Sequence, residues 1–518
     1  MEEELRATAA SLGFQVAAEE VDEYVALLER MEKSLQTVSD MPDYQPTPDH
    51  AIYPRSDIHF PTADSNPLAA WAWKFNATST APKSDLLKGK TLCLKDNIAV
   101  AGVPCLLGTD TFKNWIPNTD ATVVTRILDA GGIITGKAVC ENLSRGAVSV
   151  TAATGPVHNP YAHGYSAGGS SSGTAALVAS GATDMGIGCD QGGSIRIPAS
   201  LCGLYGFKPT VGLVPYTGIA SNDACLDFVG PMTTTCLDNA ILLEAIAGVD
   251  GLDDRQSAGA PFSGQVPHYA QILEETKEDG IKEFKIGILK EGLDLPGINP
   301  EVEKKFQDAM DVFRQLGATV EDIHVPIHLQ ARTIIVVLSK MGNHMGMLGK
   351  ATGRRQMMLT DLFEKKNLPY TPEALDKMSV MIKEALISGE YAWKHYSTLY
   401  PKVVNLMRKL RDDYDKALEQ YDVLVMPTTI TESNKLPATD ASPLEHINAS
   451  KGKLENTSPF NASGHPALAV PIGLVPSREN PSIDLPTSMQ IVGRYWDELT
   501  ILKIAYAWER EIGNWKEF

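Results

Sequence analysis

The sequence predicts an α/β fold, with a mixed, mostly parallel twisted sheet that is covered by helices on both faces. Short apolar runs alternate with amphipathic helical segments, the pattern of repeated strand–helix–strand units. The chain has 518 residues, of which 43% are hydrophobic, enough to bury a large core. In such sheets, ligands bind at the carboxyl ends of the strands. Polar side chains that follow a strand are therefore the first candidates for a site.

The first predicted element is an amphipathic helix within residues 1–40. Its apolar residues recur at spacings of three and four and form one stripe: Val21, Tyr24, Val25, Leu28, Met31 and Leu35. A proline-rich stretch, 41–67, follows as a wrapping linker would. We therefore divide the chain into residues 1–68, a helical extension with its linker, and 69–518, the main domain. The stripe packs either on the chain's own body or on a second copy.

The main domain is expected to contain several strand–helix–strand units and one helical insertion. The insertion, at about 329–400, is rich in methionine, which suits a malleable pocket wall but is more often ordinary core. The expected units are strand 91–96, helix 120–132 and strand 133–138, then strand 284–291, helix 300–317 and strand 319–326, then helix 405–421 and strand 422–427.

Composition excludes several classes of function. A net charge of −18 and a pI near 5.1 argue against binding to nucleic acids or to anionic membranes, because both need a basic surface. No apolar run approaches the ~20 residues that span a bilayer, and the N-terminus has no signal-peptide pattern, so we expect a cytoplasmic protein. The seven cysteines contain no C-x-x-C pair and predict neither a disulfide framework nor a zinc site.

The segment 164–212 carries two serines flanked by glycine, Ser170 and Ser194. A Gly-Gly-Ser turn aims successive backbone N–H groups at one point and stabilises the oxyanion that forms when a hydroxyl attacks a carbonyl. Upstream, Lys95 ends a short apolar run, and burial would lower the pKa of its amine enough for it to act as a base. These three residues predict nucleophilic catalysis by a serine.

The segments that hold these residues, LCLKDN, AGGSSSG and GCDQGGSIRIP, resemble the amidase signature family, whose members hydrolyse C–N bonds with a Ser-Ser-Lys triad. The resemblance extends from about Leu87 to the C-terminus. It includes GPVHNP, GFKPTVGLVP, NTSPFNASGHPALAVPIG and LPTSMQIVGRYWDE. Two departures, GGSSSGT where the family usually has GGSSGG and GCD where it has GTD, replace no member of the triad.

The resemblance implies a role for each motif residue. Ser194 would be the acyl-enzyme nucleophile, Ser170 a bridging serine with a cis peptide bond, and Lys95 the general base. The backbone of Gln191, Gly192, Gly193 and Ser194 would form the oxyanion hole. Residues 146–151 and 457–464 are implied as pocket segments, and the mechanism needs no metal, ATP or organic cofactor. The N-terminal extension resembles that of nitrile-metabolism amidases, which implies a homodimer.

The implied function is hydrolysis of a small carboxamide to a carboxylate and ammonia or an amine. Alternatives are the glutaminase subunit of a tRNA amidotransferase, a hydrolase whose main substrate is a carbamate or an ester, and a catalytically inactive scaffold. A cysteine nucleophile, Cys93 or Cys189, is a rival for Ser194. Two structural expectations complete the analysis: an Asp190–Arg196 ion pair that clamps the serine loop, and capping of the next helix by the serines at 171 and 172.

Overall fold

The computed structural model describes the whole chain except residues 112–113, 351–352, 367–369 and 439. The chain folds into two compact units, Met1–Pro46 and Thr47–Phe518. The division lies within the stretch that we expected to be linker. Strand β1 (Arg55–His59) already pairs with the sheet of the larger unit.

The small unit contains α1 (Glu2–Ser11), a short 3₁₀ turn η1 (Ala18–Glu20) and α2 (Val21–Ser39), and α1 packs on α2. The apolar stripe of α2 begins with a buried residue, Val21. Further along, its large apolar side chains are exposed: Tyr24, Leu27, Met31, Leu35 and Val38. The helix is therefore amphipathic, but its apolar face is only partly covered.

The large unit is built on a mixed sheet in the order β1-β2-β4-β3-β7-β9-β8-β13-β14-β12-β10-β11. Parallel pairings join β4, β3 and β7, and again β12, β10 and β11, whereas antiparallel pairings join the strands between these groups. The strands are β2 (Trp71–Ala77), β3 (Thr91–Lys95), β4 (Ile133–Ala138), β7 (Met185–Asp190), β8 (Tyr205–Lys208), β9 (Phe228–Thr233), β10 (Lys285–Leu289), β11 (Thr319–Ile323), β12 (Val423–Pro427), β13 (Ala467–Pro476) and β14 (Asp484–Gly493). A separate pair joins β5 (His158–Asn159) to β6 (Ala162–Ser166).

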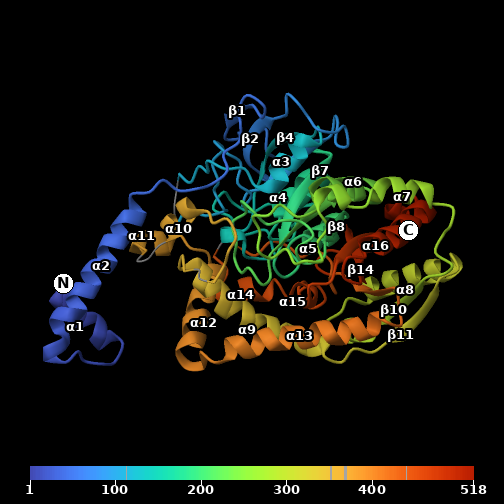
Figure 1. Ribbon diagram of the computed structural model, residues 1–518. Helices are drawn as coiled ribbons and strands as arrows, with labels where there is room; N and C mark the ends of the chain where they lie inside the picture. Colours follow the sequence, from blue (N-terminus) through green and yellow to red (C-terminus); the bar gives the residue numbers. More distant parts are fainter. Residues whose placement is uncertain (112–113, 351–352, 367–369, 439) are drawn as a thin grey trace. The chain divides into compact units, whose positions relative to one another are not determined.

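Helices cover both faces of this sheet, as the sequence predicted (Figure 1). The α-helices are α3 (Thr122–Asp129), α4 (Ser172–Ala179), α5 (Arg196–Cys202), α6 (Cys236–Ile246), α7 (Tyr269–Glu275), α8 (Pro300–Gln315), α9 (His328–Met347), α10 (Thr360–Lys366), α11 (Pro372–Asp376), α12 (Val380–Tyr396), α13 (Leu399–Leu418), α14 (Pro443–Asn448), α15 (Pro459–Ser463) and α16 (Glu498–Ile512). The 3₁₀ turns are η2 (Asn142–Ser144), η3 (Ser263–Gln265), η4 (Lys290–Gly292) and η5 (Trp515–Glu517).

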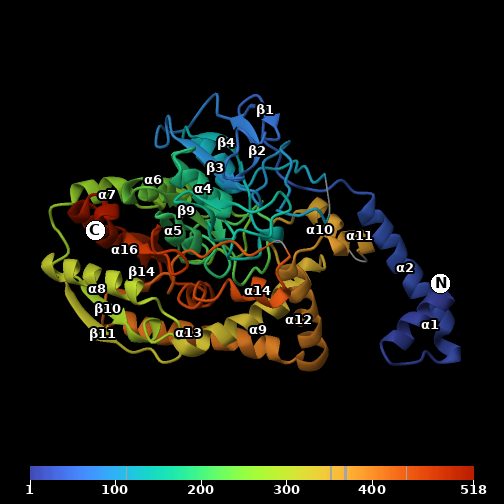
Figure 2. The ribbon, with the colours of Figure 1, turned by 180° about the vertical axis from the view of Figure 1, so that it is seen from behind.

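The two faces have separate cores. Helices α3, α6, α8 and α16 pack in the larger core on one face. On the other face, α4 and α5 cover one part of the sheet, and α9 and α13 cover the part around β12 and β14. Helices α9 and α12 of the expected insertion contact each other, and α13, which follows the insertion, also contacts α9 (Figure 2).

Strand alternation explains why Lys95 faces α4. Along β3, Leu92 and Leu94 enter the larger core, whereas Cys93 enters the core under α4 and α5. Successive side chains of a strand point to opposite faces, so Lys95 lies on the same face as Cys93. The lysine thereby reaches the chain segment that begins α4.

No helix in the described part of the chain is long and apolar enough to cross a membrane.

Candidate active site

A buried lysine and a buried serine meet where β3 ends. Lys95 is fully buried and its Nζ donates to Ser170 Oγ at 2.7 Å and to the carbonyl of Cys189 at 3.2 Å. Burial lowers the pKa of the Lys95 amine, although the electrostatic influence of acidic groups nearby, first Cys189, opposes the shift. The amine therefore loses its proton more easily than an exposed lysine, and its partner is a hydroxyl.

Ser170 and Ser194 approach the same point from two chain segments. Ser170 lies two residues before α4 and its peptide bond to Gly169 is cis, whereas Ser194 follows β7 in the turn that enters α5. The N–H of Ser171 donates to the carbonyl of Ser194 at 3.3 Å, so the two segments are in contact. Among the described residues, the Ser170 and Ser194 hydroxyls form no hydrogen bond with each other. Catalytic hydrogen bonds are often loose before substrate binds.

The turn that carries Ser194 presents unpaired backbone N–H groups. The Gly193 N–H donates to Asp190 Oδ1 at 2.6 Å and is therefore not available to an oxyanion. Within the described part of the chain, the N–H groups of Gln191, Gly192 and Ser194 have no protein acceptor. Gly193 has φ +135°, and a Cβ on it would lie 2.7 Å from Ile197 Cδ1. Glycine is thus required at this step of the turn.

An ion pair holds this turn, as the sequence predicted. Asp190 and Arg196 are fully buried, and the guanidinium donates to both carboxylate oxygens at 3.0 Å. Arg196 Nη1 also donates to the Thr457 carbonyl and to Gln490 Oε1, both at 2.7 Å. Burial alone would raise the pKa of Asp190, but Arg196 holds it below its ordinary value. The pair fixes the turn from both of its ends.

A cavity of about 330 Å³ opens beside Ser194. Its walls come from the serine turn, from the segment after η2, and from α9 and α12 of the helical insertion. Of the two pocket segments implied by resemblance, 146–151 supplies Gly146 and Ala147, whereas 457–464 does not line the cavity and instead supports the turn through Thr457. Met381 of the helical insertion also lines the cavity. Polar and charged side chains line the cavity as well: Arg145, Arg332, Ser339, Lys340, Asn343 and Glu384.

Comparison with known proteins identifies the family. The Amidase family model matches residues 56–502. The chain belongs to the amidase signature family. It is 38% identical over 469 residues to the enantioselective amidase of Rhodococcus rhodochrous, covering 88% of this chain and 85% of that one. A glutamyl-tRNA(Gln) amidotransferase polypeptide of Caldanaerobacter subterraneus subsp. tengcongensis is 34% identical over 82% of this chain and 83% of its own.

A solved structure supports the same conclusion. The peptide amidase of Stenotrophomonas maltophilia matches with a TM-score of 0.64 and 27% identity, over 82% of this chain and 83% of that one. The family and these relatives make the chain an enzyme, a hydrolase of C–N amide bonds. The α/β fold predicted from the sequence is confirmed by the same likeness.

A buried carboxylate that the sequence did not predict, Glu141, lies against the segment 146–151 and the turn before Ser170. Glu141 accepts hydrogen bonds from the N–H groups of Val148, at 3.1 Å, and Thr151, at 2.7 Å. A Cβ on Gly146 would lie 2.9 Å from its carboxyl carbon, and one on Gly169 would lie 3.0 Å from its Cγ. Both glycines therefore let backbone pack directly on Glu141. An isolated acidic residue after a strand is not a recognisable sequence motif, so the supporting role of Glu141 could not be predicted from the sequence.

The structure corrects one smaller expectation and weighs against another. Ser171 does occupy the N-cap position of α4, but its side chain makes no capping hydrogen bond and donates instead to the Cys189 carbonyl at 3.1 Å. Ser172 donates to the Val139 carbonyl at 3.4 Å. The cysteine rivals are buried, and burial raises the pKa of Cys93 to about 12 and that of Cys189 to about 11. Thiols with such pKa values are poor nucleophiles at neutral pH.

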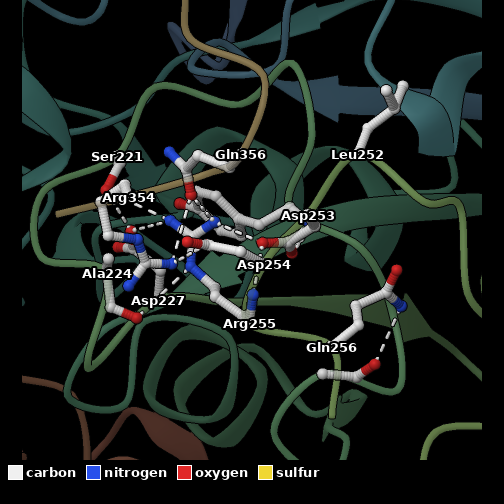
Figure 3. Close-up of polar contacts among 12 residues, drawn as sticks. Ser221, Ala224, Asp227, Leu252, Asp253, Asp254, Arg255, Gln256, Arg354 and Gln356 are labelled. Atoms are coloured by element: carbon white, nitrogen blue, oxygen red, sulfur yellow. Dashed lines mark hydrogen bonds and ion pairs between the residues drawn. The ribbon is translucent and has the colours of Figure 1, made fainter. Parts of the chain in front are cut away.

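A second charged cluster surrounds Arg255 and holds the loop from Ser221 to Asp227 (Figure 3). Arg255 forms ion pairs with Asp227 and Asp253, each at 3.0 Å, and donates to Gln356 Oε1 at 2.8 Å. The loop between Ser221 and Asp227 carries Asn222, which lines the cavity beside Ser194. The cluster thus holds one wall of the cavity in place, and the Arg255 guanidinium in it is paired with carboxylates.

Proposed function

We propose that the enzyme hydrolyses a carboxamide through an acyl-enzyme on Ser194, with Lys95 as the general base and Ser170 as the bridging serine. The observation that carries this proposal is the 2.7 Å hydrogen bond between the buried Lys95 amine and Ser170. This bond lies at the carboxyl end of β3, and the Ser194 turn begins at the carboxyl end of the neighbouring parallel strand β7. A lysine whose pKa is lowered by burial can accept a proton, and a hydroxyl beside it can relay one.

The proposed reaction has two halves. Ser194 Oγ bonds to the carbonyl carbon while its proton passes through Ser170 to Lys95, and the oxyanion is stabilised by the N–H groups of Gln191, Gly192 and Ser194. The relay then returns the proton to the leaving nitrogen, and the C–N bond breaks to release ammonia or an amine. In the second half, water loses a proton to the relay, its oxygen bonds to the acyl carbon, and Ser194 regains its proton as the acid leaves.

The test is hydrolysis by the purified chain of aliphatic, aromatic and anilide amides, glutamine, carbamates and esters, followed as released ammonia, amine or, for the esters, alcohol, alongside Ser194→Ala. We expect turnover of amides that falls by several orders of magnitude in Ser194→Ala and in Lys95→Ala, with a trace left in Ser170→Ala. Faster turnover of esters or carbamates than of amides would instead favour the alternative main substrate. Near-normal turnover by pure Ser194→Ala would contradict the acyl-enzyme assignment.

The glutaminase subunit of a tRNA amidotransferase is the second candidate, because the chain is also similar to glutamyl-tRNA(Gln) amidotransferase polypeptides. The enantioselective amidase is the more similar of these relatives, at 38% identity against 34%, so we do not favour this alternative. Glutamine in the substrate panel tests it. Hydrolysis of glutamine alone, stimulated by a partner protein, would revive it.

We also propose that the enzyme is a homodimer in the cytosol, with residues 1–68 as the dimerisation element of a catalytic domain at 69–518. The apolar face of α2, exposed at Leu27, Met31 and Leu35, supports dimerisation. The free state of all seven cysteines fits a reducing compartment. Light scattering of the full chain measures its mass, and Met31→Glu should release monomers if the face is the interface.

A further inference from the structure

The cavity beside Ser194 carries more positive than negative charge. Arg145, Arg332 and Lys340 line it, and Glu384 is the one acidic residue among the described residues that do so. Glu384 already has partners, since Lys340 Nζ forms an ion pair with it and Ser388 Oγ donates to it at 2.7 Å. Glu384 is thus paired with Lys340, and its field also reaches Arg145 without forming an ion pair with it in the described part of the chain. Two arginines remain.

Neither arginine has a carboxylate partner in the described part of the chain. Arg145 and Arg332 form no ion pair there, and the hydrogen bond that Arg145 makes is a 3.4 Å contact from Nη2 to Ser339 Oγ. The Nε of Arg145 is buried without any acceptor among the same residues. A buried donor without an acceptor is unfavourable, and more so when the group is charged. An incoming anion would remove that cost.

Arg255 nearby shows the contrasting arrangement. It is also buried, and it is paired with the carboxylates of Asp227 and Asp253 (Figure 3). The fold therefore supplies carboxylates to an arginine that serves as structural support. For Arg145 and Arg332 in the cavity, the described part of the chain supplies no carboxylate in an ion pair. The two guanidinium groups nevertheless lie close enough to repel each other. Mutual repulsion of two unpaired cations in a small cavity is unfavourable unless an anion joins them.

The charge balance favours an anion with a single charge. Glu455 acts on Arg332 through space and offsets part of its positive charge, without forming an ion pair. Burial lowers the pKa of Arg145, and so does the field of Arg332, while Glu384 and Asp223 act on Arg145 in the opposite direction without forming an ion pair among the described residues. A carboxylate carries one negative charge and matches the planar fork of a guanidinium.

From this geometry we infer that the enzyme's preferred substrate is a small amide that carries a carboxylate, bound by Arg145 and Arg332 in the cavity beside Ser194. The inference rests on the proposed function, because it takes Ser194 as the reacting group. The carboxylate belongs either to the acyl part, as in the monoamide of a dicarboxylic acid, or to the amine part, as in an N-acyl amino acid. Both present the same group to the arginines.

The test compares substrates that differ only in charge. Glutaramate is matched with pentanamide, which has a methyl group in place of the carboxylate, and N-acetyl-β-alanine is matched with N-propylacetamide. We expect kcat/KM to favour the anionic member of at least one pair by about 10- to 100-fold, the range for a hydrogen bond to a charged group. The pair that shows the preference identifies the side that carries the carboxylate.

Variants assign the preference to the arginines. Arg332→Met and Arg145→Met should each bring the ratio within a pair close to one, through KM more than kcat, and Arg332→Lys should restore part of it. Lys409→Met is the matched control, because Lys409 is an exposed cation on α13 that pairs with Asp413, and it should leave the ratio unchanged. Circular dichroism checks that each variant is folded.

The outcomes separate the inference from the proposed function. Equal or faster turnover of the neutral amides, still dependent on Ser194, would overturn the inference and leave the function standing. If no substrate is turned over, calorimetry with Ser194→Ala decides. Tighter binding of an anionic amide than of its neutral match supports the inference while the catalytic proposal fails, and binding without preference overturns the inference.

Discussion

Replacement of Asp190 by asparagine tests whether the buried ion pair holds the catalytic turn. The carboxylate accepts from Gly193, Asn461 and one guanidinium nitrogen at Oδ1, and from Ile195 and Arg196 Nε at Oδ2. In Asp190→Asn, a carbonyl oxygen keeps one of these sets, and the NH₂ group faces the donors of the other. At least one guanidinium N–H of Arg196 and one backbone N–H thereby lose their acceptor inside the core.

The expected cost follows from that count. Each orphaned donor costs about 1–3 kcal/mol, and removing one member of a buried ion pair costs about 3–5 kcal/mol. We therefore expect Asp190→Asn to lower the free energy of unfolding by about 3–5 kcal/mol. The Ser194 turn would also lose its fixed geometry, so we expect kcat to fall by about 100- to 1,000-fold, the effect of losing one oxyanion donor.

Urea unfolding followed by circular dichroism measures the first effect and amide hydrolysis the second. The control is Asp308→Asn on the surface of α8, where the 2.7 Å pair with Lys304 is exposed to solvent and should contribute little to stability. A loss below about 1 kcal/mol in Asp190→Asn, together with wild-type kcat, would refute the clamp.

The same carboxylate predicts a dependence on acid. Because Arg196 holds the pKa of Asp190 below its unfolded value, the stability from this pair is complete above the ordinary aspartate pKa near ~3.9 and is lost as the pH falls through the lower, folded value. Asp190→Asn removes this titration. The difference in unfolding free energy between wild type and variant should therefore be constant near neutral pH and shrink only in strong acid.

Two further predictions concern the triad and the turn. Burial lowers the pKa of Lys95, and the neutral amine is the base. We therefore expect kcat/KM to fall as the pH decreases through that lowered pKa, and to reach its plateau well below the ordinary value of ~10.4. A pH–rate profile centred near ~10.4 would contradict a buried base. Gly193→Ala should reduce activity at least 100-fold, because its Cβ would collide with Thr457 Oγ1 and Ile197. Gly192→Ala should keep most of the activity, because its Cβ would lie 3.5 Å from Leu454. Equal activities of the two glycine variants would show that the turn tolerates a side chain at either position.

The local pattern of the sequence was sufficient for elements in which one period dominates. A short apolar run predicted strand β3 with Lys95 at its end, and the three- and four-residue spacing predicted α2. The parallel β3–β4 pairing then followed from the strand–helix–strand order. These features depend on neighbours in the chain, so a single sequence records them.

Contacts between distant segments could not be predicted in the same way. Arg196 binds Thr457 and Gln490, which follow it by more than 250 residues, and nothing in the local sequence links them. Likewise, Ser171 has the residue type and position of a helix cap, but the Cys189 carbonyl across the core takes its hydroxyl. A tertiary acceptor in reach outweighs the local preference for capping.

By itself the sequence determined the α/β class, the family and the candidate residues Lys95, Ser170 and Ser194, because short glycine-rich motifs and strand periods are local. Only the tertiary structure decided which N–H groups of the turn stay free, and that α9 and α12 bring Arg332 and Glu384 to the cavity beside Ser194. The physical reason is that charge balance in a cavity depends on which side chains the fold brings together. Whether an arginine is paired is a property of its neighbours in space.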